Sequence, residues 1–89
     1  MSSSDLPARI HDRLEEALHP SQLDLADESH LHVGHVGAVG GHFRVRIVSE
    51  RFRGRALVER HRLVYEALKD LMGSEIHAMG IEALTPDEV

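Results

Sequence analysis

Two short runs of alternating apolar and polar residues, separated by a glycine-rich stretch, constrain the fold of this chain most strongly. "QLDLADE" spans residues 22–28 and "HFRVRIVS" spans residues 42–49. Alternation with a period of two is typical of a strand that is buried on one face. The intervening stretch "SHLHVGHVGAVGG" contains both glycine and histidine in excess of what a tight turn needs. The sequence therefore predicts an antiparallel hairpin with a long loop, its first strand running from Gln22 to about Asp27.

Helical patterns lie on both sides of this hairpin. Apolar residues recur at helical spacing from Leu6 to Leu18, with Ser4 or Asp5 available as a cap and Pro20 as a stop. A second helix is predicted from Ala56 to Met72. Its proposed apolar stripe consists of Leu57, His61, Val64, Tyr65, Leu68, Leu71 and Met72. Between the hairpin and this helix, "SERFRG" predicts a break or a single helical turn, and "EIHAMGIEAL" at residues 75–84 predicts a third strand.

Length and composition limit the chain to a single domain with one thin core, since it has only 89 residues. We expect residues 1–4 to be flexible and residues 85–89 to form a polar tail. With no cysteine, the chain offers neither a disulfide nor a thiolate ligand, which fits a cytoplasmic location. No apolar run approaches the length of a membrane span, and the N-terminus lacks the pattern of a signal peptide. The order of the elements predicts an α+β fold with a small sheet covered by helices on one face.

Charge is distributed unevenly along the chain. The net charge is −5, yet seven of the ten Lys and Arg residues lie between Arg44 and Arg62. Only Glu50 and Glu59 oppose them within that span. The overall charge argues against a protein that coats nucleic acid, but a local positive face remains compatible with it.

Several motifs, in order, resemble signatures of the BolA family. They are "DESH" at 27–30, "HF" at 42–43, "VSERFRG" at 48–54, "RHRLVY" at 60–65 and "IHAMGI" at 76–81. The resemblance implies a class II KH-like fold, α-β-β-α-α-β, with a three-stranded mixed sheet and helices packed on one face. It also implies partnership with a monothiol glutaredoxin around a shared [2Fe–2S] cluster in iron–sulfur trafficking or iron and redox regulation.

By motif position, the resemblance assigns the cluster ligands to His32 in the loop and His77 before the last strand. His35 is an additional loop imidazole and a less favoured ligand. Glutaredoxin and glutathione are expected to supply the thiolates, so the isolated protein should bind no cofactor. Alone, it is expected to be a monomer or a weak homodimer, without membrane association.

Other interpretations of the histidines compete with this assignment. His42 is favoured as structural, and His61 as a half-buried residue with a hydrogen-bond partner. His77 could also simply end a strand and bind a carbonyl group. The close spacing of imidazoles in "HLHVGH" permits a mononuclear zinc or copper site, although structural zinc sites usually show tighter paired spacing.

The second function that the resemblance implies is that of a DNA-binding, stress-responsive transcriptional regulator. Its candidate phosphate contacts are Arg44, Arg46, Arg51, Arg53, Arg55, Arg60 and Arg62. The segment "RFRGRAL" contains no GXXG sequence, the loop with which KH modules grip a nucleic-acid backbone. No pattern indicates a nucleophile with an oxyanion hole, so enzyme activity is not expected.

Overall fold

The computed structural model describes residues 5–28 and 41–89 of the chain. The first helix, α1 (Leu6–Leu18), begins where the Asp5 carboxylate accepts a hydrogen bond of 3.4 Å from the Ala8 amide. This contact confirms Asp5 as the cap. The helix ends at His19, whose positive φ of 45° turns the chain away just before Pro20. Ile10, Leu14 and Leu18 are buried, whereas Ala17 remains exposed.

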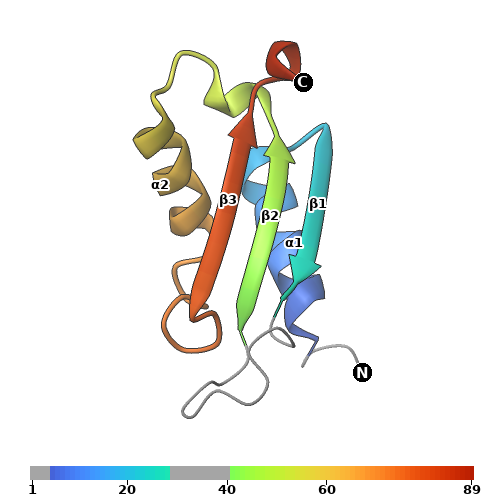
Figure 1. Ribbon diagram of the computed structural model, residues 1–89, viewed down its shortest axis with the longest axis vertical. Helices are drawn as coiled ribbons and strands as arrows, with labels where there is room; N and C mark the ends of the chain where they lie inside the picture. Colours follow the sequence, from blue (N-terminus) through green and yellow to red (C-terminus); the bar gives the residue numbers. More distant parts are fainter. Residues whose placement is uncertain (1–4, 29–40) are drawn as a thin grey trace.

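A three-stranded mixed sheet forms the centre of the domain. Strand β1 (Gln22–Asp27) pairs antiparallel with β2 (His42–Val48), which confirms the predicted hairpin. Strand β3 (Ala78–Leu84) pairs parallel with β2, so β2 lies in the middle of the sheet (Figure 1). The base of the hairpin loop is closed by the Glu28 amide, which donates to the His42 carbonyl oxygen at 2.7 Å.

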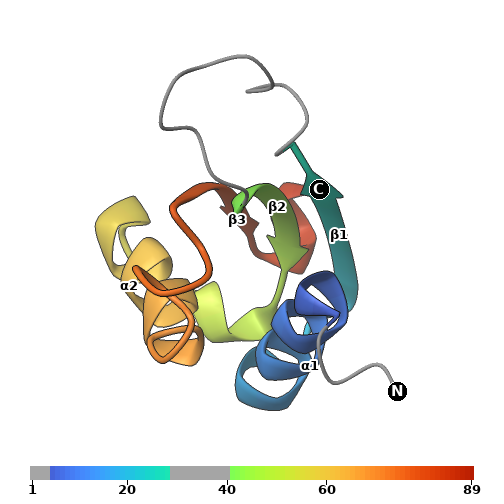
Figure 2. The same ribbon diagram turned by 90° about the horizontal axis from the view of Figure 1, so that it is seen from below.

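Parallel pairing of β2 with β3 requires a crossover connection between them. The crossover contains a 3-10 helix, η2 (Glu50–Phe52), and then α2 (Leu57–Ala67). Both α-helices pack on the same face of the sheet (Figure 2). The core lies in this interface. Its buried residues include Ile10, Leu14, Phe43, Val45, Ile47, Phe52, Val64, Leu68 and Ile76.

The predicted helix over 56–72 is too long, and the predicted strand over 75–84 begins too early. α2 ends at Ala67, and the chain continues in turns in which the Leu71 amide donates to the Leu68 carbonyl oxygen at 2.8 Å. These turns bury Leu68, Leu71 and Ile76. The helical spacing of apolar residues therefore continues in the sequence beyond Ala67, where the helix ends.

The predicted stripe on α2 is wrong at two of its residues. Leu57 is 67% exposed and Tyr65 is 39% exposed, whereas Arg60 is buried. The arginine is accommodated because its guanidinium group binds the carbonyl oxygens of Arg55 and Ala83 and the carboxylate of Glu88. Residues 85–89, predicted as a polar tail, include a short 3-10 helix, η3 (Pro86–Glu88), in which Glu88 binds Arg60.

Candidate functional site

His77 lies at the end of the sheet from which the hairpin loop departs. It directly precedes β3, and its side chain is exposed. Its amide donates a 2.8 Å hydrogen bond to the Gly41 carbonyl oxygen, and the Ala78 amide donates to the same oxygen at 3.1 Å. Gly41 is the residue immediately before β2. The structure therefore places His77 beside the point where the loop rejoins the sheet.

Gly41 permits this close approach. Its φ of +90° lies in the left-handed region, which side chains other than glycine rarely adopt. A Cβ atom at this position would lie 2.2 Å from the Glu75 carbonyl oxygen and 3.2 Å from Cδ2 of His77. Only glycine fits here without displacing the segment that carries the histidine.

Two ion pairs hold the segment before His77 against α1. The Arg9 guanidinium group binds the Glu75 carboxylate in a bidentate manner, and the Arg13 guanidinium group binds Asp70. The Arg13 contact lowers the pKa of Asp70 below its usual value. A planar guanidinium fixes both the distance and the direction of its partner. The backbone leading to His77 is thus attached to β2 on one side and to α1 on the other.

The predicted loop ligands His32 and His35 fall within residues 29–40, outside the described part of the chain. In residues 5–28 and 41–89, no three His, Cys, Asp or Glu side chains are grouped so that they could hold a metal ion. The described donors therefore contribute at most a partial ligand set. A metal centre at His77 requires ligands from the loop, from another molecule, or from both.

The structural interpretations of two other histidines agree with their positions. His42 is half-buried at the start of β2 and accepts the hydrogen bond from Glu28 through its carbonyl oxygen. His61 is half-buried on α2. Neither placement tests whether the residue can bind a metal.

Most of the candidate phosphate-binding arginines are engaged by protein groups. On the sheet face away from the helices, Arg44 binds Glu28 at 3.1 Å, and Arg46 lies 3.6 Å from Glu82. Arg53 binds Glu50 at 2.7 Å and Asp87 at 3.2 Å. Those two carboxylates raise the pKa of Arg53, and Arg53 lowers the pKa of Glu50.

Arg60 is buried, unlike a side chain poised to contact phosphate. It is 8% exposed, and its guanidinium group donates to the carbonyl oxygens of Arg55 and Ala83 at 2.9 and 3.0 Å. It also binds the Glu88 carboxylate at 2.7 Å. These contacts give Arg60 a structural role, which corrects its assignment to an exposed basic patch. Arg51, Arg55 and Arg62 are exposed and form no ion pair with another described residue.

Sequence patterns missed the residues that position His77. Gly41 was one glycine among several in the loop, and Arg9 and Glu75 were ordinary charged residues far apart along the chain. The available signal was a glycine directly before a strand, where backbone freedom often marks a close approach. Nothing in a single sequence indicates that Arg9 and Glu75 form an ion pair.

The fold and this site define a small α+β domain. An exposed histidine, His77, precedes β3 at the end of the sheet where β1 and β2 are connected. Residues 14–88 match the family model described as "BolA-like protein". The chain belongs to the BolA-like family, which confirms the family indicated by the motifs.

Known relatives and a solved structure agree with this membership. The chain is 44% identical over 88 residues to SufE-like protein 1 of Arabidopsis thaliana, covering 91% of this chain and 24% of the relative. It is 42% identical over 85 residues to BolA-like protein 1 of Mus musculus, covering 96% and 61%. The solved BolA domain of SufE1 from Arabidopsis thaliana superposes with a TM-score of 0.84 at 47% identity, covering 92% of this chain and 93% of that one.

The chain spans less than two thirds of the length of these two curated relatives. No helix among the described residues is long and apolar enough to cross a bilayer. The Arabidopsis relative carries the words "chloroplastic/mitochondrial" in its name, so a cytoplasmic location stays a prediction for this chain.

Proposed function

We propose that this protein is an adaptor that binds a monothiol glutaredoxin and contributes histidine ligands to a shared [2Fe–2S] cluster. The observation that carries the proposal is the hydrogen bond between the His77 amide and the Gly41 carbonyl oxygen. It holds an exposed imidazole at the base of a loop that is rich in further imidazoles. The family resemblance supplies the nature of the cluster and of the partner.

Chain geometry is compatible with ligation by His77 and a loop histidine together. His32 follows Glu28 by four residues, and an extended residue spans at most about 3.6 Å. The Cα of His32 is therefore within about 14 Å of the Cα of Glu28, at the same end of the sheet as His77. His35 precedes Gly41 by six residues, so the chain is also long enough for His35 to reach the end of the sheet that carries His77. We prefer His32 because its position matches the family motif.

Ligand chemistry explains why a partner is needed. The chain has no cysteine, and the thiolates that iron–sulfur clusters require must come from another molecule. Imidazole ligands in place of thiolate raise the reduction potential of such a cluster. In the proposed complex, glutaredoxin and glutathione supply sulfur, and this protein supplies nitrogen.

The docking surface that we propose consists of the exposed face of α2 together with β3. Leu57, Val58 and Tyr65 are 67%, 62% and 39% exposed, and all three belong to α2. Exposed apolar side chains grouped on one element are typical of a protein interface. The edge of β3 away from β2 pairs with no other strand of the described sheet, and the chain leading into this strand contains His77.

The test is to mix the protein with a cluster-loaded monothiol glutaredoxin and record visible absorption and circular dichroism. Wild-type protein should change the cluster spectrum, and His77→Ala should abolish that change because it removes one imidazole ligand. His11→Ala is the matched control, since His11 is an exposed histidine on α1. His32→Ala and His35→Ala then show which loop histidine contributes.

Two results would contradict the proposal. His77→Ala could change the spectrum as wild type does, which would exclude His77 as a ligand. Alternatively, His11→Ala could abolish the change as completely as His77→Ala, which would indicate a non-specific histidine effect. Pull-down of glutaredoxin in the absence of the cluster separates the loss of a ligand from the loss of docking.

A further inference from the structure

A groove lies between the C-terminal end of α1, the η2 region and α2. Its volume is about 290 Å³, and it is lined by Ala17, Leu18, Arg51, Arg55, Leu63, Glu66 and Ala67. A second hollow of about 270 Å³ shares Arg55, Leu63 and Glu66 with the first and extends to Glu59 and Arg62. The two hollows are adjacent along α2, and we call them together the arginine groove.

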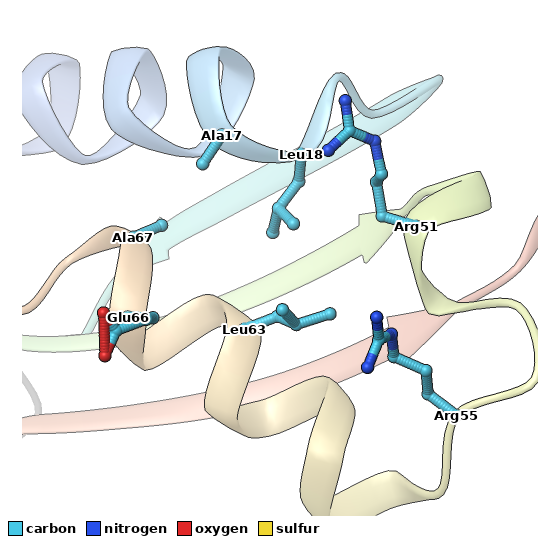
Figure 3. A pocket seen from close by; sticks show the side chains of 7 residues that line it. All are labelled: Ala17, Leu18, Arg51, Arg55, Leu63, Glu66 and Ala67. Carbon is cyan, nitrogen blue, oxygen red and sulfur yellow. The ribbon is translucent and has the colours of Figure 1, made fainter.

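The arginine groove combines an apolar floor with cations. Leu18 and Leu63 come from α1 and α2, and the guanidinium groups of Arg51 and Arg55 point into the groove at one end (Figure 3). Glu66 lies at the opposite end. Arg51 and Arg55 form no ion pair with any other side chain in residues 5–28 and 41–89, in contrast to Arg53 between them. Positive charge without a counter-ion therefore borders an apolar surface.

We propose that the arginine groove binds an acidic segment of a partner protein that also carries leucine-like side chains. Its carboxylates would bind Arg51 and Arg55, and its apolar side chains would pack on Leu18 and Leu63. Charge-assisted hydrogen bonds to guanidinium groups are directional, so the two arginines also set the orientation of the segment. Glu66 at the far end disfavours an acidic residue there.

The acidic groups do not come from the parts of the sequence that lie outside the described residues. Residues 1–4 and 29–40, which lie outside the described ranges, contain no Asp or Glu. The acidic C-terminal residues are already engaged, because Glu88 binds Arg60 and Asp87 binds Arg53. An undescribed segment of this chain therefore cannot neutralise the groove.

A protein segment fits the arginine groove better than nucleic acid does. A nucleic acid carries a phosphate at every nucleotide, so phosphates would meet Glu59 and Glu66 as well as the arginines, whereas a peptide can confine its carboxylates to the arginine end. The apolar side chains of the groove cannot form hydrogen bonds with a sugar–phosphate backbone. In protein interfaces, by contrast, buried apolar side chains contribute much of the binding free energy.

The groove is separate from the docking surface proposed for glutaredoxin. Glu59, Arg62, Leu63 and Glu66 follow the spacing of one helical face. Successive residues are rotated by about 100° around a helix, which places Val58 and Tyr65 roughly a quarter-turn away from that face. The two surfaces share no lining residue, so α2 can serve two partners.

The experiment uses fluorescein-labelled peptides and fluorescence anisotropy on the full chain. The probe is a short glutamate-rich peptide with two leucines one helical turn apart, and the comparison peptide has both leucines replaced by serine. We expect micromolar binding of the leucine peptide only. Arg51→Ala combined with Arg55→Ala should weaken binding about tenfold or more, because two charged contacts are lost. Ala17→Glu should weaken it similarly by placing a carboxylate in the groove.

Matched variants make this test specific. Arg44→Ala removes the same charge from the opposite face of the sheet, where Arg44 binds Glu28, and should change affinity by less than about twofold. Glu66→Gln should strengthen binding, since it removes the only carboxylate at the far end of the first hollow. Melting curves of every variant confirm that each remains folded.

Four results would overturn the proposal. They are no binding of the leucine peptide up to about 1 mM, equal binding of the serine peptide, an equal loss with Arg44→Ala, and tighter binding of a DNA duplex with the same dependence on Arg51 and Arg55. Sedimentation adds a further check. Self-association that disappears in the Arg51→Ala, Arg55→Ala variant would assign the groove to a second copy of this chain and overturn the partner assignment.

Discussion

At the scale of single residues, the site depends on a glycine that carries no chemistry of its own. Gly41 accepts hydrogen bonds from the amides of His77 and Ala78 through one carbonyl oxygen. This arrangement connects the end of the loop to the start of β3. The candidate ligand His77 and the glycine that positions it are 36 positions apart in the sequence. Their relation is visible only in the folded chain.

Gly41→Ala should destabilise the fold and displace His77. The added Cβ meets the Glu75 carbonyl oxygen, and the φ of +90° strains any other residue. The expected loss is about 2 kcal/mol or more in the free energy of unfolding, measured by urea denaturation. Gly54→Ala is the matched control, because Gly54 also has a positive φ of 76° but no atom lies within 4 Å of its added Cβ. Equal losses for both variants would mean that the contact with Glu75 is unimportant.

At the scale of elements, Arg60 joins three parts of the molecule. It belongs to α2, it donates to Ala83 in β3, and it binds Glu88 in η3. The hydrogen bond with the Glu88 carboxylate raises the pKa of Arg60. Removing one partner of a buried guanidinium group destabilises the folded state, because the polar groups that remain lose their hydrogen bonds.

Arg60→Ala should lower the melting temperature by about 5 °C or more. Arg62→Ala removes an exposed arginine from the same helix and should change the melting temperature little. Glu88→Gln should cause an intermediate loss, and the double variant should show a loss smaller than the sum of the two single ones. Additive losses would show that Arg60 and Glu88 do not act together.

The elements themselves were predicted unevenly by the sequence. Alternation located β1 and β2 because each has one buried face, and the Asp5 and Pro20 signals located the ends of α1. The end of α2 was missed because Leu68, Leu71 and Ile76 are buried by turns, and apolar spacing alone does not distinguish a turn from another helical turn. The exposed Leu57 and Tyr65 were assigned to the core because an exposed apolar residue has the same sequence signal as a buried one.

The candidate site was predictable only in part. The motif resemblance identified His77, and the structure shows that it is exposed beside the base of the loop. The arginines were recognised as a group from their density in the sequence. Their separation into paired and unpaired members was not predictable, because it depends on carboxylates such as Glu28 and Asp87 brought close by folding.

At the scale of the whole molecule, folding lowers the pKa values of four carboxylates, and two of them, Asp70 and Glu88, bind arginines that are distant along the chain. Arg60 and the Thr85 amide lower the pKa of Glu88 from 4.5 to about 2. The pKa values of Glu50, Asp70 and Asp87 are also lowered, chiefly by hydrogen bonds from Arg53, Arg13 and Thr85, respectively. In each case the folded state favours the ionised carboxylate.

Acid should therefore destabilise the protein well above the pH at which these carboxylates become protonated in the folded state. The unfolded chain binds more protons than the folded chain between the two pKa values of each group, so stability decreases as pH falls. For Glu88 the contribution is complete above about pH 4.5 and is lost as pH approaches about 2. Urea denaturation at several pH values measures the slope.

Glu88→Gln supplies the control for this pH dependence. It removes one titrating group and should flatten the decrease in stability between about pH 4.5 and 2. A slope identical to that of wild type would show that Glu88 does not contribute to acid sensitivity.

The bond from the Glu28 amide to the His42 carbonyl oxygen closes the hairpin before the long loop begins. The entropy of closing a flexible segment grows only with the logarithm of its length, so doubling that length costs about 0.6 kcal/mol. The free energy of closing this connection therefore changes little when residues are inserted, deleted or substituted between Glu28 and His42. Relatives that share this sheet are therefore expected to differ more in the length of this connection than in the strands that border it.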